Sequence, residues 1–205
     1  MCKDNCKVVF LDRDGTMNLE VNYLHRKEDL KLIDGTAEAV RLLNEAGYKV
    51  IVITNQAGVA RGYYTEADVK ILHDYMNEVL ERDGAHVDAF YYCPHHPEHG
   101  IGIYKKKCHC RKPETGMFEM AERDLPEGID KVHSYMIGDK RIDAQAGKNF
   151  GVTGVLVGTG YGAKEHAEDR AAGLIKEDGS CPAGGYDAYA DTLLDAVRGI
   201  LGGRI

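Results

Sequence analysis

Short apolar runs alternate with longer amphipathic stretches along most of this 205-residue chain. The runs carry several apolar residues in succession, which is typical of strands buried on both faces. The stretches between them space apolar residues three and four positions apart, which predicts helices with one buried face. We expect strands at 8–11, 48–54, 87–92, 133–137 and 152–157, and helices at 36–46 and 65–83 and beginning near 116, 143, 163 and 191.

This alternation predicts an α/β fold with a doubly wound parallel sheet. We expect one domain, 1–205, because a chain of this length fits one domain and shows no internal repeat and no linker composition that would justify a second. The polar stretch 13–34 begins at a strand end and shows little periodicity, so we expect it to cover the site as a flap. Ligands of such sheets bind outside the carboxyl ends of the strands, so residues just after each strand are the candidates for chemistry.

Composition narrows the choice of partners. A net charge of −7 argues against a nucleic-acid partner. No apolar run approaches the roughly 18 residues of a membrane span, and the polar start of the chain has no apolar signal core. We therefore expect a cytoplasmic, monomeric protein with a small-molecule partner and neither a nucleic-acid nor a membrane partner.

Carboxylates follow two of the predicted strands. Asp12 and Asp14 come one residue apart after the first strand, and Asp139 follows the fourth after a glycine. A turn can aim Asp12 and Asp14 into one pocket, where one attacks and the other moves protons. Asp139 can complete a Mg²⁺ site with Asp12, a backbone carbonyl and waters, and Asp143 is placed to orient Lys140 or a metal-bound water. The alternative for Asp12 and Asp14 is a solvated acidic turn.

Two further segments carry groups suited to phosphate. Thr54 closes the second predicted strand and is followed by Asn55 and Gln56, so a hydroxyl and backbone N–H groups can donate to phosphate oxygens. Arg111 offers a fork of donors and Lys112 a point charge for a transferring phosphoryl group. The alternatives are a plain polar turn and solvated surface cations.

Cysteine and histidine cluster in one loop. Cys93 and His95 are two residues apart, as are Cys108 and Cys110, and pairs at this spacing are typical of a tetrahedral Zn²⁺ site. Four protein ligands leave no open position, so we predict a structural zinc that holds the loop 93–110 in one shape. The alternative is unligated thiols and solvated histidines. The histidines that compete as ligands are His96, His99 and His109, and the cysteines without a partner pattern are Cys2, Cys6 and Cys181.

Four motifs together resemble those of the haloacid dehalogenase (HAD) superfamily of phosphatases, which implies a HAD-like Rossmannoid fold. We expect no large cap domain, because the gaps between the motifs are too short for one. The motifs are Asp12-Arg13-Asp14-Gly15-Thr16, Thr54-Asn55-Gln56, Arg111-Lys112-Pro113 and Gly138-Asp139-Lys140. The zinc loop is similar to that of the branch acting on histidinol phosphate or on D-glycero-D-manno-heptose 1,7-bisphosphate, and the stretches 22–26 and 55–62 favour the heptose substrate. The chain departs from the pattern at Asn22, where a glycine is expected, and in its long segment 158–185.

The resemblance implies a role for each motif. Asp12 would attack phosphorus to form an aspartyl-phosphate, and Asp14 would give a proton to the leaving oxygen and later take one from water. Thr54 and Lys112 would hold the phosphoryl oxygens, and Mg²⁺ would be held by Asp12, the Asp14 carbonyl and Asp139. The residues expected to grip the rest of the substrate are Glu20, Val21, Asn22, Tyr23, Asn55, Gln56, Ala57, Arg61, Arg111 and Lys140.

The implied reaction is Mg²⁺-dependent removal of the 7-phosphate of the heptose bisphosphate, in the synthesis of nucleotide-activated heptose for surface glycans. The alternative within the branch is a phosphatase for histidinol phosphate or another small phosphomonoester. Arg61 and Arg111 favour a substrate with a second phosphate, whereas Glu20 would suit a cationic amine. An alternative of another class is a zinc-stabilised binding module whose active-site residues are relics.

Overall fold

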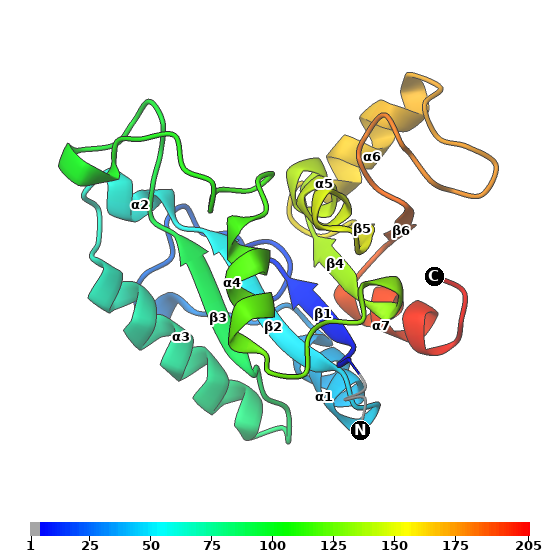
Figure 1. Ribbon diagram of the computed structural model, residues 1–205, viewed down its shortest axis with the longest axis horizontal. Helices are drawn as coiled ribbons and strands as arrows, with labels where there is room; N and C mark the ends of the chain where they lie inside the picture. Colours follow the sequence, from blue (N-terminus) through cyan, green and yellow to red (C-terminus); the bar gives the residue numbers. More distant parts are fainter. Residues whose placement is uncertain (1–4) are drawn as a thin grey trace.

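The computed structural model describes residues 5–205, which form a six-stranded parallel sheet with helices on both faces (Figure 1). Residues 1–4, and with them the prediction for Cys2, lie outside the described residues. The strands lie in the order β3-β2-β1-β4-β5-β6. Their bounds are β1 Val8–Leu11, β2 Lys49–Asn55, β3 Ala89–Cys93, β4 Tyr135–Gly138, β5 Thr153–Val157 and β6 Ala188–Ala190. The predicted doubly wound α/β fold is confirmed.

The helices cover the sheet in two layers. The α-helices are α1 Thr36–Glu45, α2 Ala57–Ala60, α3 Glu66–Glu81, α4 Gly116–Asp124, α5 Arg141–Phe150, α6 Gly162–Ala171 and α7 Leu193–Leu201. The 3₁₀ helices are η1 Lys27–Asp29, η2 Gly102–Tyr104 and η3 Lys131–His133. Helices α1, α3 and α7 pack on one face of the sheet, and α4 and α5 pack on the other.

Strand β1 is the centre of the core. Its four residues are fully buried, because Val9 and Leu11 pack into the cluster on one face while Val8 and Phe10 pack into the cluster on the other. The Phe10 ring lies 4.8 Å from that of Phe118 on α4. Burial on both faces fixes where the chain leaves the sheet, and so fixes the starting position of the residues that follow β1.

The strand order creates a switch point between β1 and β4. These two strands are neighbours, yet β1 connects onward to β2 on its other side and β4 connects onward to β5. Loops at the carboxyl ends therefore diverge and leave a crevice, which is where ligands of such sheets bind. Asp12 and Asp139 follow directly on β1 and β4 and lie at this crevice.

The sheet differs from the sequence prediction at β6 and at the bounds of other strands. Strand β6 was not predicted, because three half-buried residues at a sheet edge do not form an apolar run. Strands β3 and β4 each begin two residues later and end one residue later than predicted, at Cys93 and Gly138. In contrast, the predicted cap at Thr65 is confirmed, since its hydroxyl accepts from the Asp68 N–H and the Asp68 carboxylate accepts from the Thr65 N–H. Within residues 5–205, every helix is too short or too polar to cross a membrane.

Candidate active site

A pocket of about 280 Å³ opens at the carboxyl end of the sheet. The predicted site residues that line it are Asp12, Asp14, Glu20, Asn22, Tyr23, Thr54, Asn55, Gln56, Ala57, Arg111, Lys112 and Lys140. Val21 and Arg61 are not among the lining residues, and Asp139 lies fully buried beneath. The structure therefore brings together side chains from five separate segments, as the strand-end argument predicts.

The central contact of the pocket joins Asp12 to Lys112. The Lys112 ammonium donates to Asp12 Oδ1 at 2.6 Å and to the Ile53 carbonyl at 2.8 Å, and its third neighbour is Asp143 Oδ1 at 2.8 Å. Burial lowers the pKa of Lys112, but Asp12 and Asp143 together raise it above its usual value. Lys112 is therefore a fixed, fully charged cation beside Asp12.

Three buried carboxylates, those of Asp12, Asp139 and Asp143, place oxygens within 4.8 Å of one another. Among the described residues, Asp139 Oδ1 has no hydrogen-bond partner although it is buried. Burial and the neighbouring Asp12 raise the pKa of Asp139 to about 8. A hard divalent cation would relieve this repulsion and occupy the free oxygen, so the donor set fits Mg²⁺. Asp143 belongs to the cluster and also fixes Lys112.

The backbone after β5 holds the other oxygen of Asp139. The Tyr161 N–H donates to Asp139 Oδ2 at 3.0 Å. A Cβ at Gly160 would lie 2.1 Å from this oxygen and one at Gly15 would lie 2.3 Å from it. Both glycines have positive φ, so a side chain at either position would be strained as well as obstructed. The start of the long segment 158–185 therefore forms one wall around Asp139.

Asp14 is held from three sides. The Arg13 guanidinium donates to both its oxygens, at 2.8 Å to Oδ2 and 3.0 Å to Oδ1, while Asn18 Nδ2 donates to Oδ1 and Gln56 Nε2 to Oδ2. Burial alone would raise the pKa of Asp14, but the Arg13 charge and these hydrogen bonds hold it below its usual value. The carboxylate is therefore ionised and fixed in direction.

The segment after β2 supports both sides of the pocket. Gln56 Nε2 donates to Thr54 Oγ1 at 2.9 Å, which leaves the Thr54 hydroxyl hydrogen free to donate. The Asn55 side chain accepts from the Lys112 N–H and donates to the Lys112 carbonyl. Both amides were predicted to contact the substrate; they line the pocket, but their hydrogen bonds go to neighbouring protein groups.

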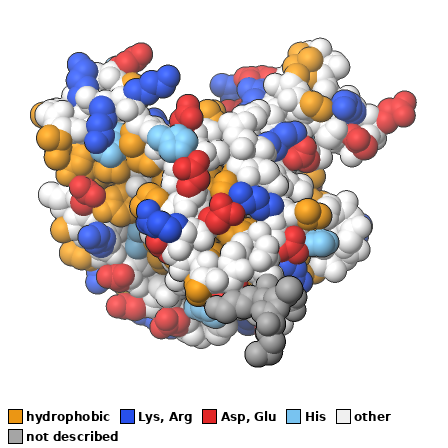
Figure 2. All heavy atoms as spheres, viewed as in Figure 1, with side chains coloured by type: hydrophobic (Ala, Val, Ile, Leu, Met, Phe, Trp, Pro, Cys, Tyr) orange, Lys and Arg blue, Asp and Glu red, His pale blue; other side chains and the backbone are white. Residues whose placement is uncertain are grey.

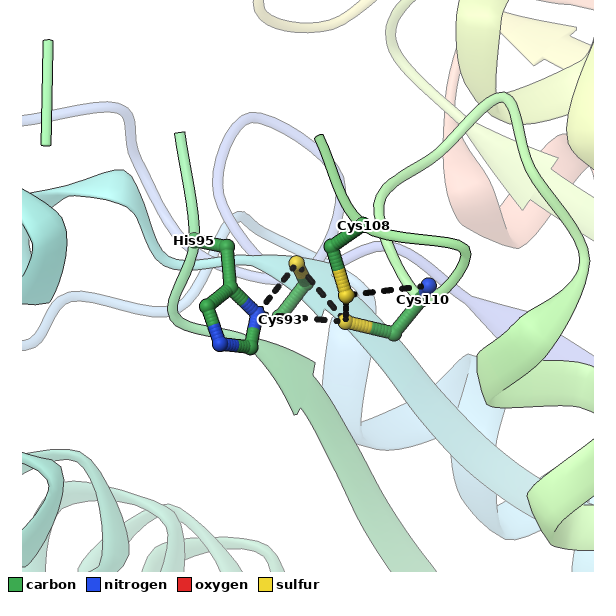
Figure 3. A group of neighbouring side chains, drawn as sticks. All are labelled: Cys93, His95, Cys108 and Cys110. Atoms are coloured by element: carbon green, nitrogen blue, oxygen red, sulfur yellow. Dashed lines mark hydrogen bonds between the residues drawn. The ribbon is translucent and has the colours of Figure 1, made fainter. Parts of the chain in front are cut away.

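The predicted zinc ligands converge at the end of β3 (Figure 3). Cys110 Sγ lies 2.9 Å from Cys93 Sγ and 2.8 Å from Cys108 Sγ, and His95 Nδ1 lies 3.6 Å from Cys110 Sγ. Hydrogen bonds from Cys110 and His95 lower the pKa of Cys93 to about 6, although burial opposes this, whereas the contact with Cys93 and burial raise the pKa of Cys110. The donor set of three sulfurs and one imidazole fits Zn²⁺.

The competing histidines point elsewhere. His96 Nδ1 accepts from the Glu98 and His99 N–H groups, and His109 Nε2 lies 2.9 Å from the Glu119 carboxylate. Of the residues described, Cys93, His95, Cys108 and Cys110 form the only group of three or more Cys and His residues whose ligand atoms lie within 4.8 Å of one another. The geometry therefore favours His95 among the candidate histidines.

Comparisons with known proteins match this geometry. The HAD-hydrolase-like family model matches residues 109–178. The D-glycero-beta-D-manno-heptose-1,7-bisphosphate 7-phosphatase of Haemophilus ducreyi is 46% identical over 80% of this chain and 90% of its own length. A D-glycero-D-manno-heptose-1,7-bisphosphate 7-phosphatase of Chlorobaculum tepidum is 38% identical over 98% of this chain and 97% of its own length. The chain belongs to the HAD-like heptose bisphosphate phosphatases.

A solved structure supports the same assignment. The D,D-heptose 1,7-bisphosphate phosphatase of B. bronchiseptica, complexed with magnesium and phosphate, matches with a TM-score of 0.76 and 30% identity. The match covers 96% of this HAD-like phosphatase and 99% of that chain. The expected family and HAD-like fold are confirmed, and the magnesium in that related structure agrees with the carboxylate cluster found here.

The rim of this HAD-like phosphatase pocket carries charge of both signs. Lys140 Nζ lies 3.8 Å from Glu20 Oε2, 3.7 Å from Asp139 Oδ1 and 4.6 Å from the centre of the Tyr161 ring. Asn22 and Tyr23 have φ of 24° and 65°. Asparagine is among the residues that best tolerate this left-handed region, which explains how Asn22 replaces the expected glycine.

Several residues of the site were not predicted. They are Arg13, Tyr64, His73, Ile142 and Tyr161. Arg13 alternates with Asp12 and Asp14, so a strand-like pattern would point it away from them. One signal in the sequence could have pointed to this part of the site. His73 is a polar residue in the otherwise apolar face of α3, beside Leu72.

Proposed function

We propose that this chain removes the 7-phosphate of D-glycero-D-manno-heptose 1,7-bisphosphate. The observation that carries the proposal is the arrangement of side chains at the switch point. The Lys112 ammonium donates to the Asp12 carboxylate, and the buried Asp139 carboxylate lies beside Asp12. Relatives that are named for this reaction and resemble the chain over most of its length support the choice of substrate. Its product would feed the synthesis of nucleotide-activated heptose, and we propose that it acts in the cytoplasm as a monomer.

In the first step, an Asp12 carboxylate oxygen forms a bond to the phosphorus while the bond from phosphorus to the sugar oxygen breaks. Asp14 transfers its proton to that oxygen, and the dephosphorylated sugar leaves. Asp14 carries this proton because the incoming phosphate dianion, a nearby like charge, raises its pKa. An aspartyl-phosphate on Asp12 remains.

In the second step, a water molecule attacks the phosphorus of the aspartyl-phosphate. Asp14, now ionised and held by Arg13, takes a proton from that water. The bond between phosphorus and the Asp12 oxygen breaks, which releases inorganic phosphate and restores Asp12. In both steps Thr54 holds a phosphoryl oxygen through its free hydroxyl hydrogen. Lys112, whose ammonium is fixed on Asp12, Asp143 and the Ile53 carbonyl, stabilises the phosphoryl charge as a point charge.

Asp12, Asp139 and the Asp14 carbonyl would hold Mg²⁺. When bound, the cation offsets the negative charges of the nucleophile and the phosphate, so that the two anions can approach. Lys140 and Arg111 face the rest of the substrate from the pocket rim, where they favour its 1-phosphate. We propose that Cys93, His95, Cys108 and Cys110 hold a structural Zn²⁺, and that residues 13–34 act as the flap of a single domain, 1–205.

The experiment is a comparison of substrates on the purified protein with Mg²⁺. Phosphate release is measured with the heptose 1,7-bisphosphate and with histidinol phosphate, and ³¹P NMR identifies which phosphate remains on the sugar. We expect faster turnover of the bisphosphate, with the 1-phosphate retained. Equal rates on the two substrates would contradict the assignment.

The Asp12→Asn variant is the matched control, because it keeps the size and polarity of the side chain and removes the nucleophile. It should release no phosphate above background while its melting temperature stays within a few degrees of the parent. Full activity in this variant would show that the nucleophile is another residue.

A further inference from the structure

Arg13 is a fully buried charged side chain, at 0% exposure. A buried guanidinium requires a partner for each of its donors, because unpaired buried charge is costly. Arg13 Nη2 donates to both Asp14 oxygens, to Gln56 Oε1 at 3.1 Å and to the Leu24 carbonyl at 3.2 Å. Its other terminal nitrogen, Nη1, faces the Nε2 atom of His73 at 3.3 Å.

The His73 ring acts as an acceptor for Arg13. A guanidinium can only donate hydrogen bonds, so His73 Nε2 is unprotonated and the proton of the neutral ring is on Nδ1. The ring is 3% exposed and stacks on Phe90, with centroids 4.5 Å apart and planes 18° apart. Burial and the Arg13 charge keep the imidazole neutral by lowering its pKa.

His73 is the point at which helix α3 reaches the catalytic machinery. Across residues 5–205, the pocket lining includes no residue of α3. The other buried residues of this helix are Val69, Leu72, Met76 and Leu80, all apolar. His73 is a polar residue in this apolar face, and a buried polar ring requires a hydrogen-bond partner. Arg13 is that partner.

We propose that His73 is a positioning residue for the reaction and acts through Arg13 on Asp14. The His73 Nε2 atom accepts from Arg13 Nη1 and so fixes the guanidinium. Arg13 Nη2 then holds the Asp14 carboxylate in the direction of the leaving oxygen. The proposal rests on the proposed function, in which Asp14 supplies the proton to that oxygen. It adds that helix α3, through His73 and Arg13, determines where Asp14 delivers this proton.

The dependence on the leaving group separates this role from a merely structural one. A sugar alkoxide is a poor leaving group and needs the proton from Asp14, whereas p-nitrophenolate leaves without one. The ratio kcat/KM reports the steps through formation of the aspartyl-phosphate. A displaced Asp14 must therefore lower kcat/KM for the sugar bisphosphate and spare that for p-nitrophenyl phosphate.

The test compares His73→Phe, which keeps the ring stack and loses the acceptor, with His73→Gln, which keeps an acceptor. For His73→Phe we expect kcat/KM on the heptose bisphosphate to fall by about tenfold or more, through kcat with KM unchanged. The value for p-nitrophenyl phosphate should change less than about threefold, and His73→Gln should recover most of the loss. The matched control is His166→Phe, since His166 is also buried and stacks on Tyr189 but bonds to Tyr186 and Arg170.

Equal losses on both phosphates, or no loss on either, would overturn the proposal. So would a rise in KM with kcat unchanged. Failure of the proposed function gives a different result: the Asp14→Asn variant would then lose no more activity on the sugar phosphate than on the aryl phosphate. Melting temperatures of all variants show whether a loss of activity follows from unfolding.

Discussion

The catalytic cluster and the zinc loop, two groups of ligating side chains, reach their geometry by different means. Asp12, Thr54 and Asp139 lie at the ends of buried strands, and Lys112 is itself buried beside them, so packing places the catalytic side chains. The zinc loop, 93–110, has only the 3₁₀ helix η2 as regular structure between β3 and its end. Its tip exposes Ile101 by 65% and Ile103 by 78%. Figure 2 shows hydrophobic, Lys and Arg side chains gathered over the part of the molecule where Figure 1 draws this loop.

The difference teaches which part of the site would depend on the proposed zinc for its shape. Packing holds the first region together, whereas the second has little packed surface and would be fixed by a metal bound to its four ligands. The two regions meet at Arg111, whose Nη1 donates to the His95 carbonyl at 3.2 Å, and at Lys112, whose backbone is held by Asn55. Loss of the proposed zinc should therefore displace the Arg111 side chain directly and the Lys112 side chain only weakly.

The largest effect is expected when the catalytic cluster loses the Lys112 ammonium. In Lys112→Met, the buried Asp12 and Asp143 keep their charges without a partner, so the free energy of unfolding should fall by about 3–5 kcal/mol. We expect kcat to fall by about 10³-fold or more, since a preorganised charge at the phosphoryl group is lost. Chemical denaturation and steady-state kinetics measure the two effects. A variant with near-parental kcat would show that Lys112 is structural.

A second effect concerns the pH dependence of stability in the catalytic region. The pKa of His73 is lowered to about 3 by burial and by Arg13, whereas a histidine of the unfolded chain titrates near 6.5. As pH falls below that value the unfolded state binds more protons than the native state, so the native state loses stability. Between pH 7 and pH 5 this loss is about 2 kcal/mol. Urea unfolding should show this slope in the parent and lack it in His73→Gln; identical slopes would contradict the buried neutral ring.

A third effect should be confined to the zinc loop. Cys108→Ser removes one of the four ligands, so the protein should lose one equivalent of zinc and become sensitive to proteolysis within 93–110. We expect KM for the heptose bisphosphate to rise by about tenfold, a loss typical of disturbed metal surroundings, while kcat changes less because Lys112 keeps its Asn55 support. Metal analysis and kinetics measure both. Unchanged zinc content would exclude the structural site, and a large loss in kcat would mean that the two regions are not separable.

The smallest effect is expected at the wall around Asp139. Gly160→Ala places a methyl group against Asp139 Oδ2 at a residue with φ of +53°, so Mg²⁺ affinity should fall by about tenfold. Isothermal titration of Mg²⁺ measures this independently of turnover. Gly173→Ala is the matched control, since its φ is +69° but no atom of residues 5–205 lies within 4 Å of the added carbon.

Much of this arrangement was predictable because local patterns and global fold agree. The apolar run 8–11 identifies the central strand, and parallel strands present their carboxyl ends at one edge, so Asp12, Thr54 and Asp139 had to meet. The four proposed zinc ligands, His95 among them, were predictable from their spacing. Three further histidines follow within the same loop, and the coordinates favour His95 over them because its ring lies with the three sulfurs.

What was not predictable are contacts between residues whose local patterns carry no sign of chemistry. His73 lies 60 positions from Arg13, and their hydrogen bond depends on how α3 packs. The enclosure of Asp139 by Gly160 depends on the backbone path between β5 and the helix predicted from about 163, which the sequence does not indicate. Strand β6 depends on pairing with β5 rather than on its own sequence.

The central claim is that Asp12 and Asp139 share one Mg²⁺ at a phosphoryl group bound to Asp12. A crystal structure with Mg²⁺ and beryllium trifluoride, which mimics an aspartyl-phosphate, tests it most directly. The account predicts beryllium bonded to an Asp12 carboxylate oxygen, fluorine atoms facing Lys112 Nζ and the Thr54 hydroxyl, and the cation in contact with both Asp12 and Asp139. Beryllium fluoride bound to another residue, or a cation that contacts Asp12 without Asp139, would contradict it.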